Sequence, residues 1–224
     1  MTFTRIAVIG LGLLGGSVGL AVRESLPGSS TTGYDADPDV RQRAAERWLV
    51  DTVCDTAAEA VAGAELVVFC VPVGAMGAAA AEIAGELSPG AIVTDVGSSK
   101  AAVGEALRSA LPGATVIPAH PVAGTERSGP DAGFASLFRH RWCILTPAAD
   151  ADPAAPTDVS RRKASLGTTR ARSRRAVSTS TDTVMSSRKN AGHGGGSENL
   201  TSMAPRWAST FGAMSVPCMI PNGA

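Results

Sequence analysis

The sequence predicts an α/β fold with a doubly wound parallel sheet, followed by a largely irregular tail. Two patterns lead to this prediction. From residue 6 to about residue 120, short apolar segments alternate with helix-forming segments, which is typical of consecutive β-α-β units. From about residue 148 the alternation stops and the chain becomes rich in Ser, Thr, Arg and Gly. We therefore expect a folded domain over residues 1–147 and a low-complexity, irregular or disordered basic tail over residues 148–224.

Each expected strand is a short run of apolar or β-branched residues bounded by Gly, Pro or polar residues. These runs lie at residues 6–9, 30–34, 50–54, 65–71, 91–96, 115–119 and 142–146. The segments between them are rich in Ala, Glu and Arg, which favour helix. Helices are expected at residues 17–26, 38–48, 56–62, 75–87 and 100–111. Asp37 is placed to cap the second helix, and Pro38 suits its first position.

Charge divides the chain at about residue 150. Residues 1–150 hold 10 Lys and Arg against 16 Asp and Glu, a net charge of −6, whereas residues 151–224 hold 10 against 4, a net charge of +6. The chain is neutral only because these two halves cancel. A hydrophobic content of 44% over 224 residues is enough for a substantial core, which the alternating pattern places in the first part.

Composition also limits the compartment and the cofactors. Cys54, Cys70, Cys143 and Cys218 are widely spaced and form no C-x-x-C pair, which indicates reduced thiols rather than disulfides or a metal site. No apolar run approaches the length of a membrane span, and no secretory leader is recognisable at the N-terminus. We therefore expect a cytoplasmic protein with no membrane partner and no bound metal.

A glycine-rich motif follows the first expected strand. The spacing G-x-G-x-x-G is present in Gly10-Leu11-Gly12-Leu13-Leu14-Gly15, between a strand and a helix. Gly10 permits a tight turn, Gly12 lets the backbone approach a pyrophosphate, and Gly15 lets the helix pack closely on the strand. The amide groups at the start of that helix, around Leu13 and Leu14, would face the phosphates. The motif predicts a Rossmann-type dinucleotide-binding domain; a glycine-rich turn without a ligand is the alternative.

An acidic residue strengthens this prediction and selects the cofactor. Asp35 ends the expected strand 30–34, twenty residues after Gly15. A carboxylate at this position accepts hydrogen bonds from the adenosine ribose and repels a 2′-phosphate, so we expect NAD rather than NADP. Val71, at the carboxyl end of the expected strand 65–71, lies at the same edge of the sheet and is a further expected cofactor contact.

Two residues at this edge are the expected catalytic residues. His120 ends the expected strand 115–119, and a neutral imidazole there can take the proton of a hydroxyl that becomes a carbonyl. Its alternative role is structural, with the ring bonded to a backbone carbonyl. Ser98 can hydrogen-bond the nicotinamide or the substrate hydroxyl, and its alternative role is to cap the next helix. Lys100 can attract an anionic substrate or lie solvated in the first turn of that helix.

Four segments together resemble prephenate/arogenate dehydrogenases. They are the glycine motif extended to Ser17, Gly33-Tyr34-Asp35, residues 95–100, and the block from His120 to Gly129 with Phe134 and Leu137-Phe138 after it. The resemblance covers about residues 4–147. It implies that His120 is the catalytic histidine at the ring hydroxyl and that Ser98 helps bind this hydroxyl and the nicotinamide. The implied reaction is NAD-dependent oxidation and decarboxylation of prephenate to 4-hydroxyphenylpyruvate, for tyrosine biosynthesis.

The resemblance ends where the composition changes. Family members continue with a helical domain that forms a homodimer and supplies an arginine for the substrate carboxylate. No such arginine, His-Asp pair or Ser-His-Leu-Pro-His-type segment can be recognised after residue 147, and only residues 206–219 weakly resemble the start of that domain. We therefore expect a chain that binds NAD and turns over prephenate slowly. Residues 151–200 are interpreted as a shifted-frame translation.

Other functions stay open from the sequence. Arogenate is an alternative substrate, and another Rossmann dehydrogenase, such as a β-hydroxyacid dehydrogenase, is an alternative enzyme that the His120 block argues against. A third alternative is a non-catalytic NAD-binding protein whose basic clusters at residues 161–163 and 170–175 bind nucleic acid or an acidic partner. Nucleic acid is not expected there, because no aromatic residue is interleaved with the arginines. The expected partner is a small-molecule substrate.

Overall fold

The computed structural model describes residues 3–146 and 218–219, and its main element is a six-stranded parallel sheet. The strand order is β3-β2-β1-β4-β5-β6. The strands are β1 (Arg5–Ile9), β2 (Ser30–Tyr34), β3 (Thr52–Val53), β4 (Leu66–Phe69), β5 (Ile92–Asp95) and β6 (Thr115–Val116). This order confirms the expected doubly wound α/β fold, in which the chain begins in the middle of the sheet and winds outwards in both directions.

All five expected helices are present, with two changes of length. They are α1 (Leu13–Ser25), α2 (Pro38–Glu46), α3 (Ala57–Val61), α4 (Met76–Ala81) and α5 (Lys100–Ala110), with short 3₁₀ turns η1 (Val73–Ala75), η2 (Pro130–Ala132) and η3 (Ala135–Phe138). α1 begins at Leu13 rather than at Ser17, directly after the glycine turn. The helix expected over residues 75–87 ends at Ala81, and Gly85 beyond it weakens further helical structure.

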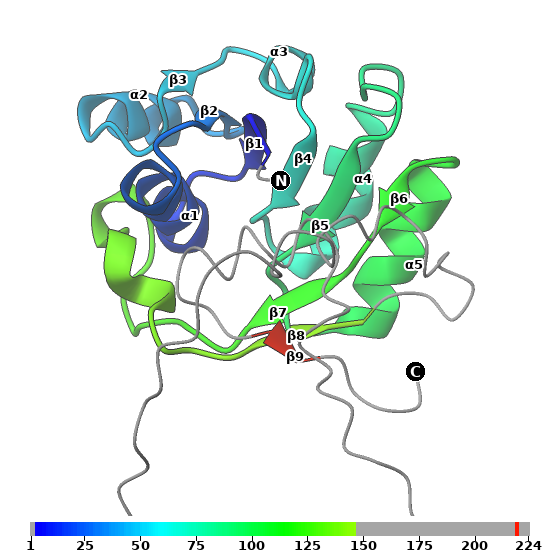
Figure 1. Cartoon of the computed structure of the whole chain (residues 1–224). Helices are drawn as coiled ribbons and strands as arrows, with labels where there is room; N and C mark the ends of the chain where they lie inside the picture. Colours follow the sequence, from blue (N-terminus) through cyan, green and yellow to red (C-terminus); the bar gives the residue numbers. More distant parts are fainter. Residues whose placement is uncertain (1–2, 147–217, 220–224) are drawn as a thin grey trace, which may run out of the picture.

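The helices cover both faces of the sheet (Figure 1). α1, α2 and η3 pack on one face, over side chains such as Ile6 and Val68, and α3, α4 and α5 pack on the other face, over Ala7 and Phe69. Strands buried on both faces are apolar at nearly every position, which explains the dense runs in the sequence. The strand order reverses between β1 and β4, and ligands of such sheets bind at the carboxyl ends of the strands near this reversal.

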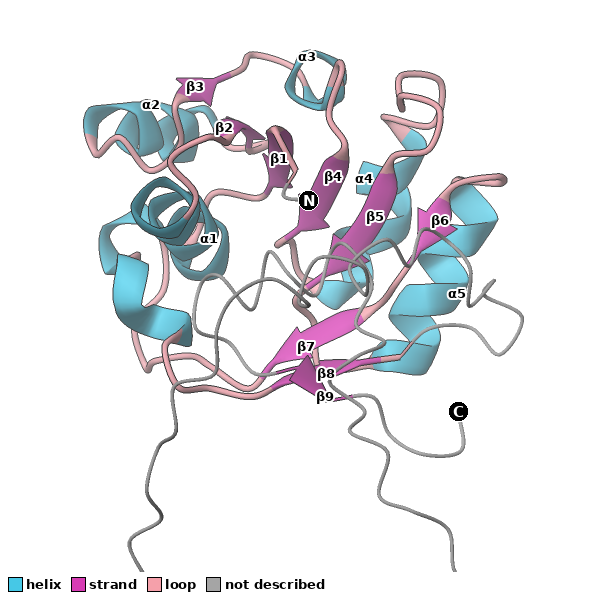
Figure 2. Ribbon diagram, viewed as in Figure 1, coloured by secondary structure: helices cyan, strands magenta, loops and turns pink. Residues whose placement is uncertain are grey.

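The last part of the domain leaves the parallel sheet. β7 (Ala119–Pro121) pairs antiparallel with β8 (Cys143–Leu145), and β8 pairs parallel with β9 (Cys218–Met219). The prediction of one strand over residues 115–119 is therefore wrong. Pro118 separates β6 from β7, because its nitrogen has no hydrogen to donate to a ladder. Figure 2 shows β7 beyond the carboxyl end of β5, so His120 lies within the small sheet and does not end a strand of the large one.

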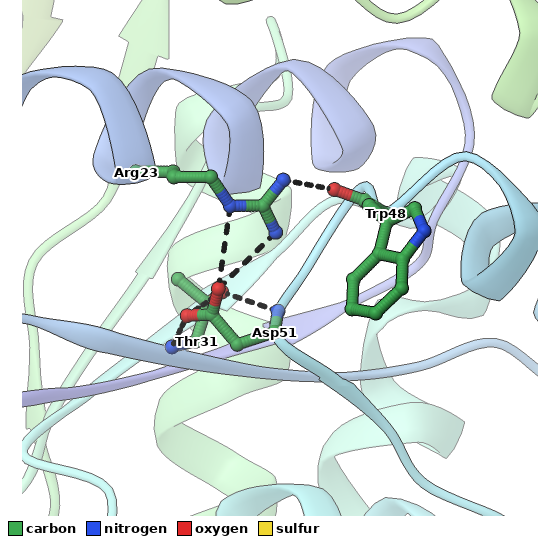
Figure 3. A network of polar contacts seen from close by, with 4 residues as sticks. All are labelled: Arg23, Thr31, Trp48 and Asp51. Atoms are coloured by element: carbon green, nitrogen blue, oxygen red, sulfur yellow. Dashed lines mark hydrogen bonds and ion pairs between the residues drawn. The ribbon is translucent and has the colours of Figure 1, made fainter.

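A network of polar contacts joins α1 to β2 and to the segment that leads into β3 (Figure 3). The carboxylate of Asp51 accepts hydrogen bonds from the backbone N–H and hydroxyl of Thr31, at 2.8 and 2.9 Å, and from Arg23 Nη2 at 3.1 Å. Arg23 also donates to the carbonyl oxygen of Trp48. The pKa of Asp51 lies below its ordinary value of 3.8: burial raises it, and the hydrogen bonds from Thr31 and Arg23 lower it by more.

The remaining expectations concern the tail after residue 147, membrane-spanning helices, metal sites and disulfides. The basic low-complexity tail over residues 148–224, the shifted-frame segment and the 206–219 remnant lie outside the described residues, apart from the two residues of β9. Within residues 3–146 and 218–219, no helix is long and apolar enough to cross a membrane and no cluster of ligands could hold a metal ion. Cys54 and Cys70 are free thiols.

Candidate nucleotide and active site

The glycine motif forms a tight turn between β1 and α1. Gly10 has a φ of 96°, a conformation that residues with side chains rarely adopt. Its N–H donates to the carbonyl oxygen of Tyr34 at 2.7 Å. A Cβ atom on Gly10 would lie 2.8 Å from the backbone of Cys70, and one on Gly15 would lie 1.8 Å from the carbonyl oxygen of Gly10. Backbone packing therefore requires glycine at both positions.

Gly12 differs from these two glycines because it faces open space. A Cβ atom on Gly12 would have no heavy atom within 4 Å. Gly12 is the N-cap of α1, and no side chain caps the helix. The amide groups of Leu13 and Leu14 therefore begin a helix whose positive end is open, an arrangement that attracts anions. This end of α1 fits a pyrophosphate, and the two leucines pack partly against the core.

Asp35 and Val71 flank the glycine turn. Asp35 Oδ2 accepts a hydrogen bond from the N–H of Leu11 at 2.7 Å, and Oδ1 accepts one from the N–H of Asp37 at 3.1 Å. These bonds hold the carboxylate at the carboxyl end of β2. On the other side, Val71 Cγ1 would lie 3.0 Å from a Cβ atom on Gly10. The predicted cofactor residues from β1, β2 and β4 thus meet around one turn.

Arg41 stands beside Asp35 and was not predicted from the sequence. Its Nη1 donates to the carbonyl oxygen of Asp35 at 2.8 Å, and its guanidinium lies 5.5 Å from the centre of the Tyr34 ring. Arginine near this position can accommodate a 2′-phosphate, but here Asp35 precedes it at the end of β2. No local sequence signal distinguishes Arg41 from the other arginines of α2.

His120 lies on β7 with its imidazole only partly buried. Its Nδ1 is buried and has no hydrogen-bond partner among the described residues. The alternative structural role, a ring bonded to a backbone carbonyl, therefore finds no support in this part of the chain. His120 lines a hollow of about 360 Å³ together with Val122, Ala123, Gly124 and Arg141. Buried polar atoms without partners are rare in folded proteins, and one explanation is a catalytic role.

Ser98 lies in the bend between β5 and α5 and is exposed. The N-cap of α5 is Ser99, and no side chain caps that helix, so the alternative role of Ser98 as a cap is wrong. The hydroxyl of Ser98 is available to a ligand. No hydrogen bond within the described part of the chain joins it to His120; Ser98 follows β5, and His120 lies on β7.

Lys100 is mostly buried and contacts Asp95 and the backbone of Ala119. Its Nζ lies 2.5 Å from Asp95 Oδ2 and 2.5 Å from the carbonyl oxygen of Ala119. Burial lowers the pKa of Lys100, and Asp95 opposes this shift. The expectation that Lys100 is solvated is therefore wrong, and its attraction of an anionic substrate stays a prediction. The sequence could not reveal this ion pair, because Ala119 reaches it only through the chain path from β6 to β7.

The segment after β7 is fastened to α1 and α2. The N–H of Phe134 donates to Ser17 Oγ at 3.1 Å, and Arg43 forms an ion pair with Asp131 at 2.7 Å. A second hollow, of about 560 Å³, is lined by Thr125, Glu126, Arg127, Asp131, Ala132, Gly133 and Phe134. The His120 block is therefore held against the helix that follows the glycine turn.

Comparison with known proteins identifies the family. The sequence profile described as "Prephenate dehydrogenase, nucleotide-binding domain" matches residues 18–170. This chain belongs to that family. The match confirms the resemblance carried by the His120 block, and it makes the domain around the glycine turn a nucleotide-binding domain.

Named relatives agree with this assignment. The chain is 46% identical over 145 residues to a cyclohexadienyl dehydrogenase of Zymomonas mobilis, covering 65% of this chain and 50% of the relative. It is 32% identical over 149 residues to a prephenate dehydrogenase of Bacillus subtilis, covering 66% of this chain and 40% of the relative. The chain thus spans about half the length of the curated relatives it matches, or less.

Solved structures show the same domain. The arogenate dehydrogenase of Synechocystis superposes with a TM-score of 0.61 at 32% identity, over 67% of this chain and 52% of that structure. A prephenate dehydrogenase from A. aeolicus, in complex with hydroxyphenyl propionate and NAD+, superposes with a TM-score of 0.63 at 27% identity, over 72% of this chain and 56% of that structure.

Proposed function

We propose that residues 1–147 are an NAD-binding domain and that the chain acts as an NAD-dependent prephenate dehydrogenase. The position of His120 is the observation that carries this proposal. Its ring has a buried Nδ1 without a described partner and belongs to β7, whose first residue, Ala119, is bound by Asp95 at the carboxyl end of β5. A base placed there lies where the reacting end of a dinucleotide belongs in this fold.

The choice of NAD rests on the glycine turn and Asp35. The open space at Gly12 and the uncapped start of α1 suit the pyrophosphate. Asp35 is held by backbone N–H groups in a fixed position, and its negative charge favours ribose hydroxyls over a 2′-phosphate. The A. aeolicus relative, solved with NAD+, supports the same cofactor.

In the proposed reaction, His120 takes the proton of the ring hydroxyl of prephenate as this group becomes a carbonyl. Bound NAD supplies the acceptor for the hydride that leaves the carbinol carbon. The bond to the ring carboxylate then breaks, carbon dioxide leaves, and the bonding electrons complete the aromatic ring and move to the ring oxygen, which takes the proton back from His120 to give 4-hydroxyphenylpyruvate. Ser98, exposed at the end of β5, donates a hydrogen bond to the substrate hydroxyl or to the nicotinamide. Alignment of the two rings is the main contribution of the protein.

Arogenate is the second candidate substrate, because the Synechocystis arogenate dehydrogenase is similar in structure and sequence. Prephenate and arogenate share the ring hydroxyl and the ring carboxylate, so His120 has the same task in both reactions. We further propose a cytoplasmic location, supported by the free thiols Cys54 and Cys70. The homodimer implied by the family resemblance is also a proposal.

The direct test is NADH formation by the purified chain with prephenate and with arogenate. His120→Asn should lower the rate by about 10² to 10⁴-fold, the usual contribution of a general base, while the Kd for NAD changes less than about twofold. His140→Asn is the matched control: His140 is exposed and has a φ of 59°, which Asn tolerates. Binding of NAD without NADH formation would favour the non-catalytic alternative, and equal rates for both variants would contradict the role of His120.

A further inference from the structure

A buried ion pair lies between β5 and β7, next to His120. Asp95 is the last residue of β5 and is completely buried. Lys100, in the first turn of α5, brings its Nζ within 2.5 Å of Asp95 Oδ2, and its side chain keeps only 14% exposure. Asp95 Oδ2 also accepts a hydrogen bond from the N–H of Gly97 at 2.7 Å. The carboxylate is therefore fixed by both charge and hydrogen bonds.

Both members of the pair hold the backbone of Ala119. Asp95 Oδ1 accepts a hydrogen bond from the N–H of Ala119 at 3.1 Å, and Lys100 Nζ donates to the carbonyl oxygen of Ala119 at 2.5 Å. The backbone N–H and carbonyl of Ala119 are not used by the small sheet. Ala119 lies opposite Leu145 in the register of β7 and β8, and the neighbouring hydrogen bond runs from Thr146 N to the carbonyl oxygen of Pro118. Backbone hydrogen bonds to β8 alternate along β7, so the N–H and carbonyl of Ala119 face away from β8. The ion pair takes the place of a neighbouring strand on that side.

The next residue after Ala119 is His120, and its ring has no side-chain restraint of its own among the described residues. Its Nδ1 has no partner there, whereas ligand-binding and catalytic histidines are usually oriented by a bond from the second nitrogen. The direction of this imidazole is therefore determined by the backbone that carries it. That backbone is fixed on one edge by β8 and on the other edge by Asp95 and Lys100.

We propose that Asp95 and Lys100 are positioning residues for His120: together they fix the peptide that precedes it and so set the direction of its imidazole. The inference rests on the proposed function, because the direction of the ring matters only if His120 acts on a substrate. It assigns to Lys100 a role through the backbone rather than a contact with the substrate. Two buried charges carry a desolvation cost that a neutral strand pair avoids, which is consistent with a role in geometry rather than in stability alone.

The competing explanation is that the pair only stabilises the junction of β5, α5 and β7. A purely stabilising role and a positioning role predict different NMR signals for the His120 ring and different values of kcat. Lys100→Met alone leaves the charge of Asp95 buried and unpaired, so it will destabilise the fold. This variant therefore cannot separate a positioning role from a stabilising one. The double variant Asp95→Asn/Lys100→Met removes both charges together and keeps an amide oxygen that accepts from Ala119. Arg139→Met is the matched control, since it removes the exposed ion pair with Glu24 on the far side of η3.

The first readout is the imidazole signals of the three histidines in nitrogen-15 NMR spectra of the full chain. Positioning predicts that the double variant changes the ring signals of His120 and leaves those of His140 and His193 in place, at a temperature where all variants are folded. Arg139→Met should change none of the three. Unchanged His120 signals in a folded double variant would overturn the inference, and this result is independent of whether the chain turns over prephenate.

The second readout separates kcat from KM. With prephenate as substrate, the double variant should lower kcat by about ten- to a hundredfold, as expected when a general base is misaligned, with the KM for prephenate and the Kd for NAD within about twofold. In the His120→Asn background, the same double change should have no further effect on kcat. An equal loss with and without His120 would show that the pair acts elsewhere. If the parent chain forms no NADH, the proposed function fails, and the NMR readout still decides the positioning role.

Discussion

Gly12→Ala and Gly15→Ala alter the same turn but are expected to damage different properties. The first should weaken NAD binding, and the second should destabilise the fold. A methyl group on Gly15 would lie 1.8 Å from the carbonyl oxygen of Gly10, which is backbone and cannot rotate away. A methyl group on Gly12 would contact nothing within 4 Å. If the space beside Gly12 is the pyrophosphate site, Gly12→Ala should damage NAD binding and leave the fold intact, whereas Gly15→Ala should damage the fold.

The expected magnitudes follow from these distances. Overpacking typically costs about 1–3 kcal/mol, and a clash with backbone places Gly15→Ala at the upper end. For a domain of this size, about 3 kcal/mol corresponds to a fall in Tm of roughly 6–12 °C. Gly12 has a φ of −70°, which alanine adopts without strain, so only a loss of about 1 kcal/mol at the N-cap is expected. A Kd for NAD raised at least tenfold, about 1.4 kcal/mol, is expected for Gly12→Ala.

Thermal unfolding gives the Tm of each variant, and calorimetric titration with NAD gives the Kd. The titration is carried out well below the Tm of both variants, so that a loss of binding does not reflect unfolding. Gly12→Ala with an unchanged Kd would refute the placement of the pyrophosphate at the start of α1. Gly15→Ala with an unchanged Tm would refute the close packing of α1 on the turn.

Three further predictions concern cofactor choice, acid stability and thiol reactivity. Asp35→Asn should reduce the preference for NAD over NADP at least tenfold in paired titrations, because Arg41 already lies beside this residue; an unchanged ratio would contradict the assignment. Asp51→Asn should lower the free energy of unfolding by about 1 kcal/mol. Since the pKa of Asp51 is depressed in the folded state, this difference should be full above pH 3.8 and shrink as the pH falls below that value; a pH-independent difference in urea titrations would contradict the network. Cys70, whose pKa burial raises, should react with a thiol reagent at pH 8 more slowly than in the unfolded chain, as checked by mass spectrometry of labelled peptides.

The glycine turn could be predicted from sequence because its motif is local. The spacing of the glycines, their place between β1 and α1, and the position of Asp35 at the end of β2 can be read from neighbouring residues, although the contact that requires glycine at position 10 is with the distant backbone of Cys70. Local patterns of this kind also determined the strands and helices up to α5. The boundaries differed mainly where short or small-residue segments carry weak signals, as at the end of α4.

The environment of His120 could not be predicted in the same way. The run over residues 115–119 has the composition of one strand, but Pro118 interrupts it, and Ala119 beyond the proline is bound by Asp95 and Lys100. These contacts depend on the position of α5 beside β6, which no local pattern encodes. The sequence therefore predicted a catalytic role for His120, which stays a prediction, and misplaced the strand that carries it.

The most direct test of the central claim is transfer of deuterium from prephenate labelled at the carbinol carbon. The purified chain is mixed with labelled prephenate and NAD, and the products are analysed by mass spectrometry. We predict one deuterium in each NADH formed, one 4-hydroxyphenylpyruvate released per NADH, and loss of both products in His120→Asn with NAD binding retained. A chain that binds NAD and prephenate but yields no deuterated NADH, or that yields it equally well without His120, would contradict the account.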